Sequence, residues 1–88
     1  MTVSILGMTY KVFHRNNEEM DGELGKCVPS KLWIQINKDI PAPQQEETLM
    51  HEALHCISDD LVLGLDEDKI QRLAVGLYSA GCRVKIWK

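Results

Sequence analysis

The run His51-Glu52-Ala53-Leu54-His55 places two histidines four residues apart. That spacing brings both side chains to one face of an α-helix, where two imidazoles can bind the same metal ion. Glu52 directly follows the first histidine, so its carboxylate can accept a proton from a water molecule on that metal. The sequence therefore predicts a helix through residues 51–55 with a zinc ion bound to it.

The second half of the chain has the apolar periodicity of two helices. Residues from about Gln44 to Asp60 repeat at three- and four-residue steps, after the segment Pro41-Ala42-Pro43, which suits a helix start. A second helix is predicted over Lys69–Ala80, with Asp66 as its N-cap and Gly81 at its end. The histidine motif would then lie on the first of two consecutive helices.

The first half of the chain is typical of β structure. Residues Ile5–His14 are rich in β-branched and aromatic side chains. Lys31–Asn37 alternates, with Leu32, Ile34 and Ile36 on one face. The polar segment between these runs, residues 16–22, is expected to join two antiparallel strands.

Length and composition allow one small domain. Eighty-eight residues, 44% hydrophobic and 26% charged, are ordinary for a single globular unit. We therefore expect an α+β fold over residues 1–88, with a small antiparallel sheet of about three strands packed with two antiparallel helices. Glu23–Val28 and Arg83–Trp87 are candidates for further short strands.

Charge, hydropathy and cysteine content restrict the setting and the partners. A net charge of −3 gives no broad basic surface, which argues against nucleic acid as a partner. No apolar stretch has the length of a membrane span, and the N-terminus lacks the pattern of a signal peptide. Cys27, Cys56 and Cys82 form no C-x-x-C pair and are expected to be reduced thiols, with Cys56 buried. These features predict a cytoplasmic protein without a membrane partner.

A catalytic zinc usually takes three protein ligands, so a third is needed. Glu67 follows the turn at Gly64 and opens the second helix, which could aim its carboxylate at the imidazoles. Asp66 and Asp68 are rivals, because a shift of one residue in the helix start would change the choice. Asp59 continues the histidine face, but it is about 12 Å along the helix axis from the first histidine. Glu67 is the preferred third ligand.

A helix with H-E-x-x-H, followed by a helix with a downstream glutamate, resembles the gluzincin branch of zinc metallopeptidases. The segment Thr48–Tyr78, TLMHEALHCISDDLVLGLDEDKIQRLAVGLY, looks like small metallopeptidases encoded by phages and prophages. The resemblance implies a minimal zincin-like fold with Zn²⁺ held by His51, His55 and Glu67, and Glu52 as general base. The chain departs from the N-E-x-x-S-D helix of larger gluzincins, because it reads LDEDK at residues 65–69.

The expected activity is hydrolysis of a peptide or protein substrate by a zinc-activated water, in a bacterial or phage-infected cell. Tyr78 and His14 are candidates for a second oxyanion donor. An extended substrate would add to the strand Lys31–Asn37, where Trp33 and Gln35 would line the groove. The alternative is a non-enzymatic phage or mobile-element protein whose zinc site is structural or vestigial and which binds a host protein.

Overall fold

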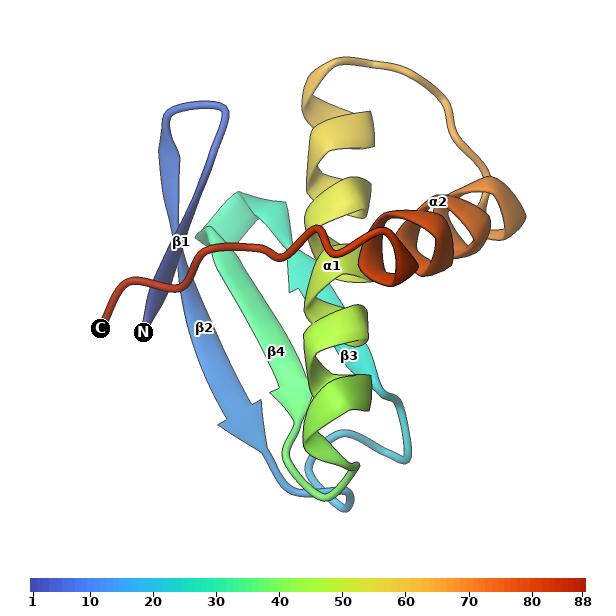
Figure 1. The fold of residues 1–88 in the computed structure, drawn as a ribbon. Coiled ribbons are helices and arrows are strands. Elements are labelled where there is room, and N and C mark those ends of the chain that lie inside the picture. The colour runs from blue at the N-terminus through green and yellow to red at the C-terminus, as the bar shows by residue number, and fades with distance from the viewer.

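The computed structural model describes residues 1–88 and has the expected α+β architecture. Four strands form one mixed sheet, and two helices lie on one side of it (Figure 1). The elements are β1 (Thr2–Ile5), β2 (Met8–Arg15), β3 (Gly25–Val28), a 3₁₀ turn (Pro29–Lys31), β4 (Trp33–Asn37), α1 (Ala42–Asp60) and α2 (Glu67–Ser79).

The sheet has the order β1-β2-β4-β3. The β1–β2 and β3–β4 pairs are antiparallel, whereas β2 and β4 are parallel. After β2 the chain crosses to β3, which forms the edge of the sheet opposite to β1, and then returns as β4, which lies between β2 and β3. Alternation of side chains indicates which face of a strand is buried, but it carries no information on the direction of the neighbouring strand.

The expected strand Ile5–His14 is divided into parts of two strands by a tight turn. Leu6 and Gly7 both have positive φ angles, 51° and 80°, and join β1 to β2 as a two-residue hairpin. Such a turn suits the right-handed twist of the paired strands. Gly7 was the local signal for this break.

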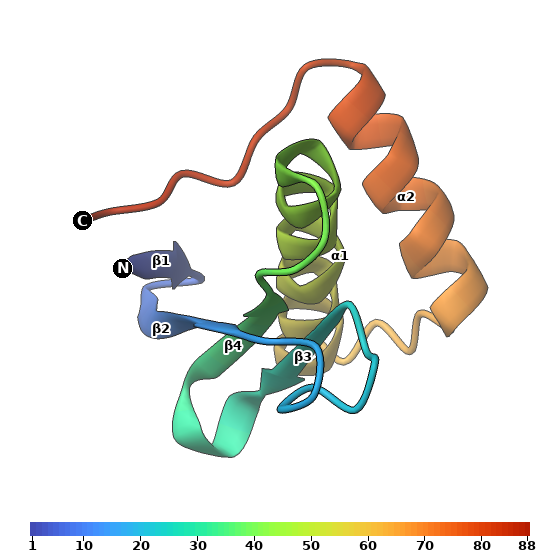
Figure 2. The same ribbon diagram turned by 90° about the horizontal axis from the view of Figure 1, so that it is seen from below.

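The core lies between the sheet and α1. The expected apolar face of Lys31–Asn37 is confirmed, because Ile34 and Ile36 are almost fully buried. α1 packs over β3 and β4 (Figure 2). The buried cluster comprises Val3, Ile5, Tyr10, Val12, Ile34 and Ile36 from the sheet and Leu49, Ala53 and Cys56 from α1.

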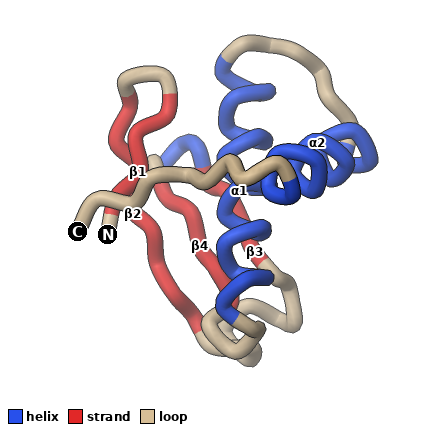
Figure 3. The backbone as a smooth tube through the Cα atoms, viewed as in Figure 1, coloured by secondary structure: helices blue, strands red, loops and turns tan.

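The helices cross steeply instead of running back along one another (Figures 1 and 2). α2 contacts α1, and two of its residues, Ile70 and Ala74, are fully buried. After α2 the chain returns as an irregular segment to β1, where Thr2 and Trp87 form an isolated bridge (Figure 3). The expected C-terminal strand is thus reduced to a single pair of residues.

The cysteine expectation is wrong for two of the three residues. Cys27 on β3 and Cys56 on α1 form a disulfide, whereas Cys82 is free and exposed. Cys56 is fully buried, as expected. The bonded residues are 29 positions apart, so their pairing depends on how α1 lies over β3 and has no local sequence signal.

Neither helix combines the length and apolar character needed to cross a membrane.

Candidate metal centre

The two motif histidines lie on α1, as the spacing predicts. Four residues apart, they share one face of the helix, and their Nε2 atoms are 3.2 Å apart. His51 is more enclosed than His55, with 14% and 30% of their side chains exposed. The two Nε2 atoms therefore point to one spot at the surface of the helix, where they could bind the same metal ion.

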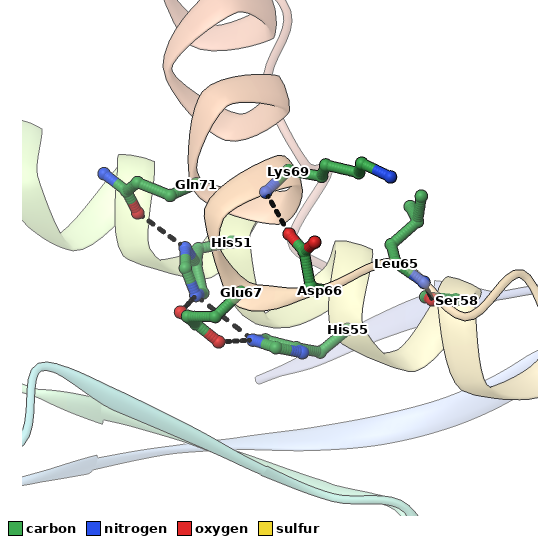
Figure 4. Close-up of polar contacts among 8 residues, drawn as sticks. All are labelled: His51, His55, Ser58, Leu65, Asp66, Glu67, Lys69 and Gln71. Carbon is green, nitrogen blue, oxygen red and sulfur yellow. Dashed lines mark hydrogen bonds and ion pairs between the residues drawn. The ribbon is translucent and has the colours of Figure 1, made fainter.

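The start of α2 is fixed by the loop that precedes it. Val62 and Gly64 adopt positive φ angles, and the Ser58 hydroxyl accepts a hydrogen bond from the backbone N–H of Leu65 at 3.1 Å. Asp66 is the N-cap, as expected, because its Oδ1 accepts a hydrogen bond from the backbone N–H of Lys69 at 2.8 Å (Figure 4). This cap makes the next residue, Glu67, the first of the helix.

Glu67 projects from this first turn toward both imidazoles (Figure 4). Its Oε1 lies 2.6 Å from Nε2 of His51, and its Oε2 lies 2.8 Å from Nε2 of His55. One ligand atom from each of the three residues lies within 4.8 Å of the other two, so the group could hold a metal ion. The structure thus assembles the expected set of side chains.

The rival carboxylates are engaged elsewhere. Asp66 caps its own helix, and Asp68 forms an ion pair with Arg72 one turn further along α2, at 3.1 Å. Asp59 lies near the buried Tyr10 and contributes to raising the pKa of that phenol, after burial and Asp60. None of the three belongs to the His51–His55–Glu67 cluster.

The donor set fits a tetrahedral zinc ion with a small adjustment. With bonds of about 2.0–2.1 Å, ligand atoms in such a site lie about 3.3 Å apart. The imidazole nitrogens already have this separation at 3.2 Å, whereas the carboxylate oxygens are too close by about half an ångström. Glu67 is 69% exposed and can retract by rotating its side chain. Two nitrogens and one oxygen also leave a fourth position open.

Gln71 holds His51 from the side away from the cluster. Oε1 of Gln71 lies 2.7 Å from Nδ1 of His51. Because an amide oxygen can only accept, Nδ1 carries the proton and Nε2 keeps a lone pair for the metal. Gln71 follows Glu67 by four residues, so both side chains arise from the same face of α2.

Glu52 lies on the inner side of α1, against the edge strand β3. It is 7% exposed, and a Cβ atom built on Gly25 would lie 3.2 Å from its Oε2. Burial raises the pKa of the Glu52 carboxyl; His51 and His55 oppose the shift, and Glu67 and Glu23 reinforce it. A carboxyl group with a raised pKa can take up and release a proton nearer to neutral pH.

These residues border a cleft of about 440 Å³ between α1, α2 and the start of β3. Its lining is strongly acidic and includes no lysine or arginine. The carboxylates come from Glu23, Glu47, Glu52 and Glu67, and the other lining residues are Gly22, Leu24, Gly25, Gln44, Thr48, His51 and Gln71.

The expected oxyanion donors are elsewhere. Tyr78, at the far end of α2, donates a hydrogen bond to Glu46 at 3.5 Å and stacks against Arg83. His14 lines a different, mostly apolar cavity of about 380 Å³, bordered by the N-terminal part of α1 and the C-terminal segment. Neither side chain lines the acidic cleft, so the structure does not bring either of them to the candidate centre.

Sequence reasoning missed three residues that shape the centre. Gln71 had a usable signal, because it lies four residues after Glu67 on the predicted helix. Glu23 and Gly25 had none, because their position beside Glu52 depends on the placement of β3 under α1.

No protein-family model matches the chain, and no curated protein or solved structure shows detectable similarity to it.

Proposed function

We propose that this protein is a minimal zinc-dependent peptidase. One observation supports the proposal above all: two imidazole nitrogens and a carboxylate from a second helix converge, while the motif glutamate is buried beside them. His51, His55 and Glu67 would hold the ion. When bound, zinc would polarise the scissile carbonyl and lower the pKa of a coordinated water.

Glu52 would act as the proton carrier of the reaction. Its carboxylate lines the cleft, and its raised pKa favours uptake of a proton from the attacking water and transfer of that proton to the leaving amine. Gln71 would keep His51 in the tautomer that presents Nε2. Thus one residue moves the proton and another maintains the ligand geometry.

An extended substrate would bind at β3. The strand expected for this role, β4, is paired on both sides, whereas β3 is at the edge of the sheet. The backbone N–H of Asn37 donates to the carbonyl of Leu24, so in the alternating antiparallel pattern the N–H and C=O groups of Gly25 and Cys27 point outward. These groups are available to a peptide strand beside the cleft.

The lining of the cleft favours a basic substrate. Four glutamates line the cleft and no lysine or arginine does, so the cleft is negatively charged. A bound zinc ion would neutralise part of this negative charge. We propose that the preferred peptides carry lysine or arginine close to the bond that is cut. Peptides with glutamate or aspartate at the same positions would be repelled.

The test compares three zinc-loaded proteins on a mixed peptide library, with products identified by mass spectrometry. Wild type should cleave, preferentially next to basic residues. Glu52→Gln should retain zinc and lose at least about 100-fold in rate. Glu18→Gln, which neutralises an exposed carboxylate in the loop between β2 and β3, outside the cleft, is the matched control and should stay within about threefold of wild type. Equal rates for Glu52→Gln and wild type would contradict the mechanism, and zinc binding without hydrolysis would favour a structural site.

A cytoplasmic location in a bacterial or phage-infected cell stays part of the proposal. The disulfide between Cys27 and Cys56 argues in the opposite direction, because such bonds persist mainly in oxidising compartments. Alkylation of thiols in intact cells before lysis distinguishes the two: a cytoplasmic protein should yield all three cysteines alkylated.

A further inference from the structure

The face of the sheet opposite to α1 has no covering element. α1 packs against the face that carries Ile34 and Ile36, and α2 contacts α1 instead of the sheet. In Figure 2 both helices and the C-terminal segment lie on one side of the strands, and no helix lies on the other. The side chains on this face therefore pack against no other element of the chain.

Two aromatic rings lie at the centre of that surface. Phe13 on β2 and Trp33 on β4 are partly exposed and meet edge to face, with ring centroids 5.2 Å apart. Cations cover both rings: the guanidinium carbon of Arg15 is 4.9 Å from the centroid of Phe13, and Nζ of Lys31 is 4.8 Å from that of Trp33. Lys11 lies directly beside Trp33 in the sheet. These five residues are called the aromatic face below.

The aromatic face is positively charged, although the whole chain is not. None of the four strands contains an aspartate or a glutamate. Lys11, Arg15 and Lys31 take part in no ion pair within 4.0 Å, whereas other arginines of the chain, Arg72 and Arg83, are paired. The acidic residues lie in the helices and loops. The acids that border this face of the sheet are Glu19, Asp21 and Glu23, which line a small hollow with Lys26 and Gln35 on the β3 side, whereas the cations at the rings lie on β2 and at the start of β4. The net charge of −3 is thus an average over surfaces of opposite sign.

We propose that the aromatic face binds single-stranded nucleic acid. Bases stack on exposed aromatic rings irrespective of sequence, and lysine and arginine bind the phosphates between them. On binding, Lys31 and Arg15 would move from the ring faces to phosphates, and bases would take their places. Lys11 and Arg15 are four residues apart, or about 13 Å along a strand, which suits about two nucleotides. The expectation that nucleic acid is not a partner depended on the net charge of the whole chain. It did not consider that the basic and acidic residues lie on different surfaces.

The same features disfavour other occupants. A second copy docked through the same face would bring like charges together, and an apolar partner would bury three cations without a counter-charge. An acidic protein surface matches the charge but makes no use of the two rings. The rings therefore distinguish nucleic acid from acidic protein.

The experiment measures fluorescence anisotropy of labelled dT12 and rU12 with the full-length protein at 50 mM salt. We expect saturable binding to one or both, with little binding to a duplex, because bases in a duplex cannot reach the rings. Three phosphate contacts predict about 20-fold weaker binding at 200 mM salt. Lys11→Glu/Lys31→Glu should weaken binding at least about tenfold. Lys69→Glu/Lys88→Glu changes the net charge equally, away from this face, and should bind like wild type.

The rings are tested by Phe13→Leu and Trp33→Leu, which keep apolar side chains on the sheet and remove the stacking surfaces. Each should weaken binding about tenfold with unchanged circular dichroism. Three results would overturn the proposal: no saturable binding to either oligonucleotide, equal loss in both double lysine variants, or equal displacement by a poly-glutamate peptide. Because zinc and peptide hydrolysis are not part of the readout, the result is independent of the proposed peptidase activity.

Discussion

Nδ1 of His51 donates a hydrogen bond to Oε1 of Gln71 across 2.7 Å, and this contact joins the two helices that carry the candidate metal ligands. It restrains the ring of the more enclosed imidazole before any metal binds. Side chains that orient a metal-binding histidine in this way commonly make a large contribution to the affinity for the metal.

Gln71→Ala should therefore weaken zinc binding about 10–100-fold, without removing a ligand. Zinc affinity is measured by competition with a chromophoric chelator. Arg72→Ala, at the adjacent and outward-facing position of α2, is the control and should bind zinc as wild type does. Unchanged affinity in Gln71→Ala would show that the contact does not orient the ligand.

Gly25 brings β3 close to the side of α1 that carries Glu52. A Cβ atom there would lie 2.6 Å from Cγ2 of Thr48 and 3.1 Å from Cγ of Glu52. Gly25→Ala should therefore lower the free energy of unfolding by about 1–3 kcal/mol, measured by urea denaturation. Adding Thr48→Ser, which removes Cγ2, should restore part of this loss.

Gly76 provides the matched control. A Cβ atom at this helical position meets nothing within 4 Å, so Gly76→Ala should stabilise the protein by about 0.5–1 kcal/mol. A similar destabilisation at both glycines would contradict the close contact inferred for Gly25.

The disulfide ties β3 to α1 one helical turn after Glu52. Residues 27 and 56 enclose a loop of about 30 residues, for which loop-closure entropy predicts a stabilisation of about 3–4 kcal/mol. Cys27→Ser/Cys56→Ser should show this loss in chemical denaturation. Purified protein treated with iodoacetamide should gain one alkyl group, on Cys82, and three only after reduction. Three groups without reductant would contradict the bond.

Glu52 should make the stability of the metal-free protein depend on pH. Its pKa is raised by burial in the folded state, so the folded state holds the proton more tightly than the unfolded state, where the value is about 4.3. The resulting stabilisation is fully present below that unfolded-state pKa and is lost as pH rises through the folded-state pKa. With EDTA present, Glu52→Gln should be more stable than wild type at pH 8, with the difference largely gone at pH 4. A difference that does not vary with pH would contradict the shift.

Much of the candidate centre could be predicted because its information is local. The four-residue spacing of His51 and His55 needs only a helix, and the Asp66 cap fixes the phase of α2 within one turn. The placement of Glu67 against the imidazoles could not be predicted in the same way, because α2 crosses α1 steeply and only the N-terminal part of α2, with Glu67 and Gln71, reaches them.

The parts that sequence reasoning missed depend on contacts between distant segments. The parallel pairing of β2 with β4 and the disulfide between Cys27 and Cys56 both arise from the order of strands in the sheet. Side-chain alternation is the same for either strand direction, so Lys31–Asn37 could be recognised as a strand but not as an interior one.

X-ray absorption at the zinc edge tests the proposed centre most directly. For protein loaded with one zinc per chain, we predict two imidazole nitrogens and oxygen ligands, all at about 2.0–2.2 Å, with one oxygen from Glu67 and one from water. Glu67→Ala should lose affinity and alter the oxygen shell, while both imidazoles remain. Sulfur scattering at about 2.3 Å, or failure of the wild-type protein to retain zinc, would contradict the account.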